Sequence, residues 1–326
     1  MDSFGRTVDY LRISITDRCN ERCLYCMPEG YHGWERQADH LSADEILRVV
    51  RVAAGLGFRK FRLTGGEPLV RRYVVEIVRG MAAIPGVEVI GLSTNGTKLA
   101  SLAQPLRDAG VRTVNVSLDA LDPQIYRRVT GGDVNTVIAG VRAALAAGFE
   151  RVKLNCVLMR GVNEQEIWPL VMFAAEHGLP LRLIELMPLT RTDVLTDQNF
   201  FPVGEAKQLL LQHDELIPQS DQHQRLGHGP AKYFQLKQTG ALVGFIGALT
   251  NLDFCASCNK VRLTSDGKLR PCLGDHLETD LKPALRPQID DAGLEKLFRQ
   301  TLAQKPEQHS FRSNYQPQRV MTAIGG

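Results

Sequence analysis

Short apolar runs and amphipathic stretches alternate along the first two thirds of the chain. The apolar runs, which predict β-strands, cover residues 10–16, 58–64, 87–94, 112–118, 150–159 and 181–187. Helical spacing of apolar residues predicts helices near residues 42–57, 70–83, 98–110, 122–128, 134–147 and 164–177. Strands that alternate with helices predict a parallel sheet with right-handed crossovers. Six such units are too few for a closed barrel of eight, so we predict an α/β fold with a partial, open parallel β/α barrel.

The alternation ends near residue 212. Residues 213–232 are polar and rich in Gln, His, Pro and Gly, which predicts a boundary or a surface loop. Three strand-like runs follow, YFQLK, LVGFIGAL and VRLT, and then a helix near residues 290–304 and a polar tail. We therefore predict two regions, the barrel over residues 1–212 and a smaller α+β region over residues 213–326.

Composition and charge argue against several classes of protein. The 326 residues carry 39 basic and 36 acidic side chains, a net charge of +3 that predicts neither nucleic-acid nor membrane binding. The N-terminus lacks the apolar core of a signal peptide, and runs such as residues 241–249 are too short to span a bilayer. We therefore expect a cytoplasmic protein that binds no nucleic acid and no membrane.

Six of the seven cysteines form two trios, Cys19, Cys23 and Cys26 in the first and Cys255, Cys258 and Cys272 in the second. Clustered cysteines in a large cytosolic chain more often hold metal than form disulfides. A structural zinc site needs a fourth ligand, for which His32 and His276 are the candidates. Three thiolates also suit a [4Fe–4S] cube with one iron open to a small molecule. The seventh cysteine, Cys156, lies in an apolar run, so we expect it in the core.

Polar motifs follow the carboxyl ends of the predicted strands, where parallel α/β folds build their active sites. They are the first trio, TGGEP (64–68), STNG (93–96), Ser117 with Asp119, and ELMP (185–188), and Lys153 lies within the fifth strand. Each motif alone is weak, and TGGEP could be only a tight turn before a helix. Together they predict one functional rim. The sequence has neither a Walker A loop nor a Gly-x-Gly-x-x-Gly turn after a strand.

The spacing Cys-x3-Cys-x2-Cys with Tyr25 before the last cysteine, together with TGGEP, resembles the signature of the radical S-adenosylmethionine superfamily. Longer motifs resemble one family within it, the GTP 3′,8-cyclases, also called molybdenum cofactor biosynthesis protein A. These motifs are LRISITDRCNERCLYCMPEG, FRLTGGEPLVRR, NVSLDALD, IELMPL, GPAKYF, DFCASCNKVRLTSDGKLRPCL and the terminal Gly-Gly. The resemblance covers the whole chain, from about residue 8 to residue 326.

The resemblance implies a radical enzyme with two [4Fe–4S] clusters, one on each cysteine trio, and with S-adenosylmethionine on the open iron of the first. A 5′-deoxyadenosyl radical would take the 3′ hydrogen of GTP, and the product would be (8S)-3′,8-cyclo-7,8-dihydroguanosine 5′-triphosphate. This reaction is the first step of molybdenum cofactor biosynthesis. The smaller C-terminal region would carry the second cluster, whose open iron would face guanine. The protein itself would orient the reactants and exclude water.

The resemblance also implies roles for single residues. Contacts to S-adenosylmethionine would come from Tyr25, Gly66, Ser117 and Met187. Contacts to GTP would come from Arg12, Arg62, Thr94, Lys153, Lys260, Val261 and Arg262, and the catalytic residues would be Arg262, Gly325 and Gly326. A triphosphate without a Walker A loop does need side-chain cations, although Arg12 and Arg62 could instead each pair with an acid. Lys260 stands where many relatives carry arginine, which puts a two-pronged contact at that position in doubt.

The implied partners are GTP, a low-potential electron donor such as flavodoxin or ferredoxin, the downstream cyclic pyranopterin monophosphate synthase, and a second copy of the chain in a homodimer. Two alternatives remain from the residues alone. One is a radical S-adenosylmethionine enzyme that modifies a peptide or another small molecule. The other is a non-catalytic iron–sulfur or zinc protein. The Arg/Lys set and the Gly-Gly tail argue against the first, and TGGEP with the predicted rim argues against the second.

The last seven residues, VMTAIGG, are more apolar than the polar segment before them. A terminus is frayed by default. The apolar residues instead predict a tail that docks, and glycines without side chains suit a narrow passage close to a ligand. The resemblance likewise implies that this tail reaches the active site.

Overall fold

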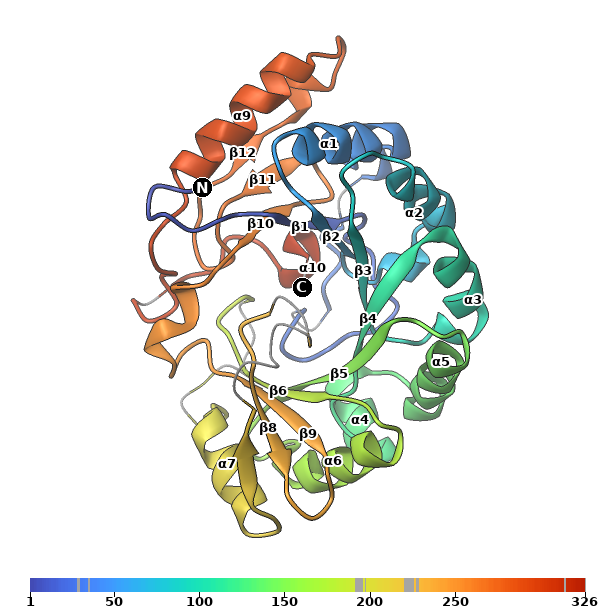
Figure 1. Cartoon of the computed structure of the whole chain (residues 1–326), viewed down its shortest axis with the longest axis vertical. Coiled ribbons are helices and arrows are strands. Elements are labelled where there is room, and N and C mark those ends of the chain that lie inside the picture. Colours follow the sequence, from blue (N-terminus) through green and yellow to red (C-terminus); the bar gives the residue numbers. More distant parts are fainter. Residues whose placement is uncertain are drawn as a thin grey trace.

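The fold is a mostly parallel twelve-stranded sheet with helices on its outer face, shown in Figure 1 as a computed structural model. The structure describes residues 1–27, 30–34, 36–190, 196, 198–219, 226, 229–313 and 315–325. The strands are β1 (Tyr10–Ser14), β2 (Lys60–Thr64), β3 (Val89–Thr94), β4 (Val111–Ser117), β5 (Arg151–Leu158), β6 (Leu181–Glu185), β7 (Leu216–Pro218), β8 (Lys232–Leu236), β9 (Leu242–Ile246), β10 (Lys260–Leu263), β11 (Lys268–Arg270) and β12 (Thr279–Asp280). The α-helices are α1 (Ala43–Gly55), α2 (Val74–Ala82), α3 (Leu99–Ala109), α4 (Pro123–Thr130), α5 (Val134–Ala146), α6 (Ile167–Glu176), α7 (Val203–Leu211), α9 (Asp291–Ala303) and α10 (Met321–Ile324).

Strands β1 to β6 lie side by side in chain order and are all parallel. Helices α1, α2, α3, α5 and α6 cover their outer face (Figure 1). Alternate strand residues, among them Leu11, Leu63 and Val114, are fully buried between sheet and helices because a strand points successive side chains to opposite faces. Cys156 is buried in the same core, as expected. The predicted partial parallel β/α barrel of six units is confirmed.

The C-terminal strands extend both edges of this sheet. β10 pairs in parallel with β1 and continues through antiparallel β11 and β12. β9 pairs in parallel with β6 and continues through antiparallel β8 and β7. The runs predicted as strands beyond residue 232 are therefore β8, β9 and β10. Because the sheet ends in β12 on one side and in β7 on the other, the barrel stays open.

One detail of the prediction was wrong. Residues 213–232 were expected to be loop, but Leu216–Pro218 forms β7. Its strand partner is distant in sequence, with Ile217 opposite Gln235 of β8, so no local pattern signals it. Part of this segment, including residues 220–225, lies outside the described residues.

The C-terminal end of the described chain lies inside the barrel. Figure 1 shows α10 near the centre of the ring of strands, and its residues Thr322, Ala323 and Ile324 are buried. The prediction that the tail docks is confirmed. In the part of the chain that the structure describes, no helix is both long enough and apolar enough to cross a bilayer.

Candidate active site

Three arginines lie side by side on the inner face of the barrel. Strand pairing sets Arg12 of β1 opposite Arg262 of β10 on one side and opposite Arg62 of β2 on the other. The three side chains therefore leave the sheet on one face and at one level. Like charges directly across neighbouring strands destabilise a sheet, so this row indicates a site for an anion.

Three further cations join this row. The strand pairings from β2 through β3 and β4 to β5 and β6 put Lys153 of β5 and Arg182 of β6 on the same face as the arginine row. Both side chains are buried. Their hydrogen bonds go to neutral groups, from Lys153 to the hydroxyl of Tyr233 (3.1 Å) and from Arg182 to Oδ1 of Asn155 (2.8 Å). Lys260 precedes Arg262 by two residues on β10. We define the basic cluster as Arg12, Arg62, Lys153, Arg182, Lys260 and Arg262.

Burial is the main cause of lowered pKa values in the basic cluster. It lowers the pKa of Lys153 to about 6, and the charge of Arg182 is the next cause. Burial also lowers the pKa of Lys260 to about 8 and that of Arg262 to about 10. The pKa of Arg12 falls well below its usual range because burial and the charge of Arg262 act together. A bound polyanion would favour the charged forms of all four groups.

Arg62 is held by the barrel wall. It donates to the hydroxyl of Tyr10, to the carbonyl oxygen of Leu92 and to the hydroxyl of Thr113. Gly91 of β3 makes room for it, since a Cβ at Gly91 would lie 2.5 Å from an Arg62 nitrogen. Arg62 therefore presents a fixed positive charge on the inner face rather than a flexible arm.

Two other residues that were predicted to contact GTP offer little of their side chains to a ligand. The hydroxyl of Thr94 donates to the Glu67 carboxylate at 2.8 Å and accepts the N–H of Gly96 at 3.0 Å. The side chain of Val261 points to the opposite face from Arg262 and is buried in the apolar core. Only the backbone of Val261 is available to a ligand on the inner face.

The TGGEP turn supports the loop that carries the first trio. The N–H groups of Gly66 and Glu67 donate to the carbonyl oxygens of Thr16 and Arg18, both at 2.8 Å. A Cβ at Gly66 would overlap the backbone oxygens of Asp17 and Arg18, so the contact requires glycine. The predicted S-adenosylmethionine contact Gly66 thus lies directly against this loop.

Glu67 joins the TGGEP turn to the STNG turn. Its buried carboxylate accepts hydrogen bonds from the N–H of Leu69 (2.9 Å), the N–H of Asn95 (2.7 Å) and the hydroxyl of Thr94. Burial raises the pKa of Glu67 to about 7, although these hydrogen bonds oppose the rise. Two motifs that are separate in the sequence are therefore one supported rim.

The other predicted S-adenosylmethionine contacts lie in the loop of the first trio and at the carboxyl ends of β4 and β6. The hydroxyl of Tyr25 donates to the buried carboxylate of Asp119 at 2.8 Å, and Asp119 also accepts the N–H of Val157 at 2.8 Å. Ser117 ends β4. Met187 follows β6 and packs against the apolar cluster that contains Leu189.

The first trio lies in an anionic setting. Burial raises the pKa of Cys19 to about 12, and nearby Glu67 and Glu21 raise it further. Burial, Cys26, Glu21 and Asp119 raise the pKa of Cys23 well above its usual range. Because the charged form of a thiol is the metal ligand, a bound cationic centre is needed before these three sulfurs can act as thiolates.

A backbone N–H near each sulfur of the second trio lowers the pKa of that thiol. The N–H groups are those of His309 at Cys255, Lys260 at Cys258 and Gly274 at Cys272, and they oppose the effect of burial. The N–H of Cys258 in turn donates to the Cys255 carbonyl oxygen at 3.0 Å, which closes a turn. His276, the candidate fourth ligand, stacks on Tyr315 with the ring centroids 4.7 Å apart. His32, the candidate at the first trio, is exposed.

All seven cysteines are free thiols. Among the described residues, no group of three histidines, cysteines or carboxylates is arranged to hold a single metal ion. The fit to an iron–sulfur cluster therefore rests on the donors themselves. Each trio supplies three thiols, and at the second trio Lys305 Nζ donates to Sγ of Cys258 at 3.5 Å, a contact that stabilises a cluster thiolate.

The C-terminal tail reaches the arginine row. Arg262 donates to the carbonyl oxygen of Gly325. A Cβ at Gly325 would lie 2.9 Å from Cβ of Ser14 and 3.1 Å from Cγ2 of Thr64, and Gly325 has a φ of +88°. Both facts favour glycine. The structure thus brings the predicted catalytic residues Arg262 and Gly325 together, whereas Gly326 lies outside the described residues.

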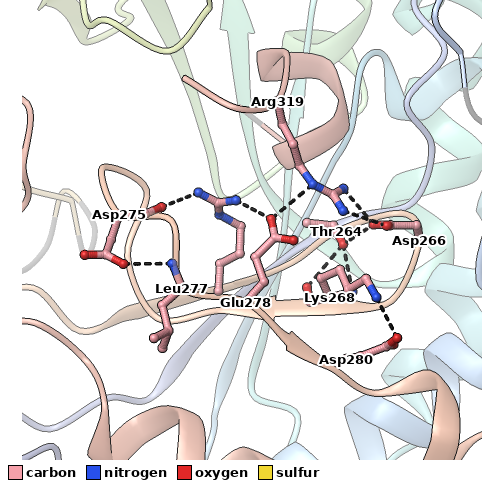
Figure 2. Close-up of polar contacts among 9 residues, drawn as sticks. Thr264, Asp266, Lys268, Asp275, Leu277, Glu278, Asp280 and Arg319 are labelled. Atoms are coloured by element: carbon pink, nitrogen blue, oxygen red, sulfur yellow. Dashed lines mark hydrogen bonds and ion pairs between the residues drawn. The ribbon is translucent and has the colours of Figure 1, made fainter. Parts of the chain in front are cut away.

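A charged clamp anchors the tail (Figure 2). Arg319 donates to both oxygens of Asp266 at 3.1 and 2.9 Å, and its Nε lies 3.1 Å from Glu278. Glu278 also pairs with Arg270 of β11. A second anchor is Thr190, whose hydroxyl donates to the Cys26 carbonyl oxygen at 2.9 Å and accepts the N–H of Met321 at 3.1 Å. The tail is therefore tied both to the β10–β11 hairpin and to the first trio.

Sequence reasoning missed Arg182, Glu67 as an organising carboxylate, and the Arg319 clamp. Arg182 could have been found, because LRLIE alternates in the same way as the strands of Arg12 and Arg62. The clamp had no local signal, since Arg319 and Asp266 lie 53 residues apart.

The chain is similar to known proteins over its full length. The family described as "Radical SAM superfamily" matches residues 13–174, and the family described as "Molybdenum Cofactor Synthesis C" matches residues 179–311. A GTP 3′,8-cyclase of Moorella thermoacetica is 44% identical over 326 residues, covering 100% of this chain and 99% of that protein. A GTP 3′,8-cyclase of Pseudomonas entomophila is 44% identical over 332 residues, covering 100% and 98%.

A solved structure supports the fold independently. The structure of Streptococcus suis SuiB bound to S-adenosylmethionine matches with a TM-score of 0.63 at 16% identity, over 89% of this chain and 68% of that chain. A sequence identity of 16% supports a shared fold and nothing more. The full-length relatives, in contrast, share more than two fifths of their residues with this chain. The chain therefore belongs to the GTP 3′,8-cyclase family of the radical S-adenosylmethionine superfamily.

Proposed function

We propose that this chain is the enzyme that converts GTP into (8S)-3′,8-cyclo-7,8-dihydroguanosine 5′-triphosphate, the first step of molybdenum cofactor biosynthesis. The single observation that carries the proposal is the basic cluster on the inner face of the barrel, where Lys260 and Arg262 lie near the second cysteine trio. Three in-register arginines need a polyanion, and a nucleoside triphosphate fits that need. The full-length relatives point to the same activity.

The proposal assigns the residues as follows. Cys19, Cys23 and Cys26 would hold one [4Fe–4S] cluster and Cys255, Cys258 and Cys272 a second. Tyr25, Gly66, Ser117 and Met187 would contact S-adenosylmethionine. Bound there, S-adenosylmethionine would supply the radical chemistry that acts on the 3′ position of GTP. GTP would be bound by Arg12, Arg62, Thr94, Lys153, Lys260, Arg262 and the backbone of Val261, and we add Arg182 to this set.

The chain's own groups would orient the substrate and keep water out. Fixed guanidinium groups such as Arg62 and Arg262 hold a triphosphate by charge-assisted hydrogen bonds. The Gly325 carbonyl on Arg262 would bring the tail against a substrate bound to the basic cluster. The resemblance also makes Gly326, which lies outside the described residues, a catalytic residue. We also propose the two-region division near residue 212, a cytoplasmic location, a flavodoxin- or ferredoxin-type electron donor, product transfer to the downstream synthase, and a homodimer.

One experiment tests the function directly. The protein is reconstituted anaerobically with iron and sulfide, and S-adenosylmethionine and dithionite are added with GTP, with ATP or with neither. We expect 5′-deoxyadenosine and a cyclised product that depend on GTP, and about eight iron atoms per chain. Cleavage that is equally fast with ATP or without nucleotide, and no cyclised product, would contradict the proposal.

Lys153 should take up a proton when GTP binds. The pKa of Lys153 near 6 makes it mostly neutral at pH 7.5, and an adjacent triphosphate favours the ammonium form. Affinity should therefore fall as the pH rises above 6, until the pH passes the higher pKa of the complex. Calorimetry in two buffers of different ionisation enthalpy would measure close to one proton taken up. The uptake should fall by most of one proton in Lys153→Met, where only the smaller uptake by Lys260 remains, and it should persist in the control Lys296→Met, whose side chain is exposed on α9.

A further inference from the structure

Lys305 is a buried lysine beside the second trio. It follows α9 and is only 2% exposed. Its Nζ donates to the carbonyl oxygen of Pro271 at 2.7 Å, to the carbonyl oxygen of Lys260 at 2.8 Å and to Sγ of Cys258 at 3.5 Å. An ammonium group has three donor hydrogens, so each has a partner here.

These three contacts join the two segments that carry the trio. Lys260 lies two residues after Cys258, and Pro271 directly precedes Cys272. The ammonium group of Lys305 therefore fixes the spacing between two ligand-bearing segments that are separated by the β10–β11 hairpin. Its one side-chain partner among the bonds that the structure gives is a sulfur, and the other two are neutral carbonyl groups.

A buried ammonium group is costly unless it is paired with an anion. Within the described residues, no carboxylate forms an ion pair with Lys305, whereas the exposed Lys237 pairs with Glu215. Two further cations lie close to the trio, Lys260 beside Cys258, and Arg6, which donates to the Cys255 carbonyl oxygen at 3.1 Å and pairs with Asp2. The anion that balances Lys305 must therefore be the trio itself in its thiolate form.

The first trio has the opposite setting. Three carboxylates, Glu21, Glu67 and Asp119, lie near its sulfurs, with Arg22 near Cys19. At the second trio, the ammonium group of Lys305 instead lies 3.5 Å from Sγ of Cys258. Carboxylates therefore predominate beside the first trio, whereas a buried ammonium group contacts the second.

We propose that Lys305 is a positioning residue that raises the reduction potential of the iron–sulfur cluster at the second trio. The proposal rests on the assignment of a cluster to that trio. Reduction adds one electron from an external donor, and hence one negative charge, to a cluster that already carries three thiolates. A fixed cation that also donates an N–H to a ligand sulfur stabilises the reduced form more than the oxidised form. The potential is therefore higher than it would be without Lys305.

The test is a redox titration of the reconstituted holoprotein, followed by electron paramagnetic resonance. Lys305→Met removes the charge and all three donors, and Lys305→Gln removes the charge but keeps an N–H donor. We expect the reduction equilibrium of the second cluster to shift by about tenfold or more in both variants, which is a fall of about 59 mV per tenfold for one electron. Lys305→Arg should keep most of the potential. The first cluster is the internal reference and should not move.

Lys296→Met is the matched control, because it removes one positive charge from the exposed face of α9. An unchanged second potential in folded Lys305→Gln, or an equal shift in Lys296→Met, would overturn the role of Lys305. If Lys305→Met does not fold, Lys305→Gln decides. Wild-type protein with about four irons instead of about eight would overturn the second cluster, and this proposal with it, while GTP-dependent 5′-deoxyadenosine would still support the catalytic function.

Discussion

Gly325→Ala should abolish cyclisation of GTP while leaving cleavage of S-adenosylmethionine largely intact. The new Cβ would lie 2.9 Å from Cβ of Ser14 and 3.1 Å from Cγ2 of Thr64, in a backbone with a φ of +88°. The tail must then move off Arg262, which holds the Gly325 carbonyl oxygen. We expect the cyclised product to fall about a hundredfold or more, a size typical of a group misplaced by about 1 Å at a reacting centre.

The measurement is the ratio of cyclised product to 5′-deoxyadenosine under anaerobic turnover. Gly240→Ala is the matched control, because Gly240 has a φ of +70° but a Cβ added there would meet no atom within 4 Å. It tests the backbone strain without the steric overlap. Deleting Gly325 and Gly326 should match Gly325→Ala. Full cyclisation by either variant would show that the tail is only a docked end.

Arg319→Met should lower the ratio of cyclised product to 5′-deoxyadenosine by about tenfold, in the same direction as Gly325→Ala. The clamp from Arg319 to Asp266 and Glu278 is partly exposed, with 23% of the Arg319 side chain accessible, so its worth is below the roughly 1.5–3 kcal/mol of a buried hydrogen bond to a charged group. Losing it frees the segment that leads into α10. The product ratio should fall, whereas iron content and S-adenosylmethionine cleavage should stay close to wild type.

Two comparisons make this test specific. Asp266→Asn should resemble Arg319→Met, and the double variant should be no worse than either, because the two residues act as one pair. Arg299→Met removes an exposed arginine of α9 that pairs with Glu295 on the same helix and should change nothing. Additive losses in the double variant, or an unchanged product ratio in Arg319→Met, would refute the clamp as the device that positions the tail.

The electrostatics of the barrel explain why the tail and the substrate meet at one place. Arg12, Arg62 and Arg262 share one level of the inner face, and the Gly325 carbonyl oxygen occupies one donor of Arg262. A triphosphate on this row would leave the tail beside it. The three hydrogen bonds from Arg62 to the barrel wall keep the arginine row rigid. A rigid row lowers the entropy lost when the substrate binds.

Local sequence patterns were enough to predict the parallel β/α units, the first cysteine trio and the rim. Each depends on local spacing: apolar periodicity decides strand or helix, and three cysteines within eight residues must lie close together in any fold. The sequence also placed Arg12 and Arg62 on strands whose partners were expected to be parallel. Those predictions hold because neighbouring residues and chain order alone decide them.

Contacts between residues that are far apart in the sequence became visible only in the folded chain. The row of Arg12, Arg62 and Arg262 depends on the register of three strands, and a shift by one residue would turn one of these side chains into the core. Lys305 lies 47 residues from Cys258, and Arg319 lies 53 residues from Asp266. Contacts of this kind arise when β10 adds to the edge beside β1 and the tail folds back into the barrel. Long-range pairing is a property of the folded chain, so no local pattern encodes it.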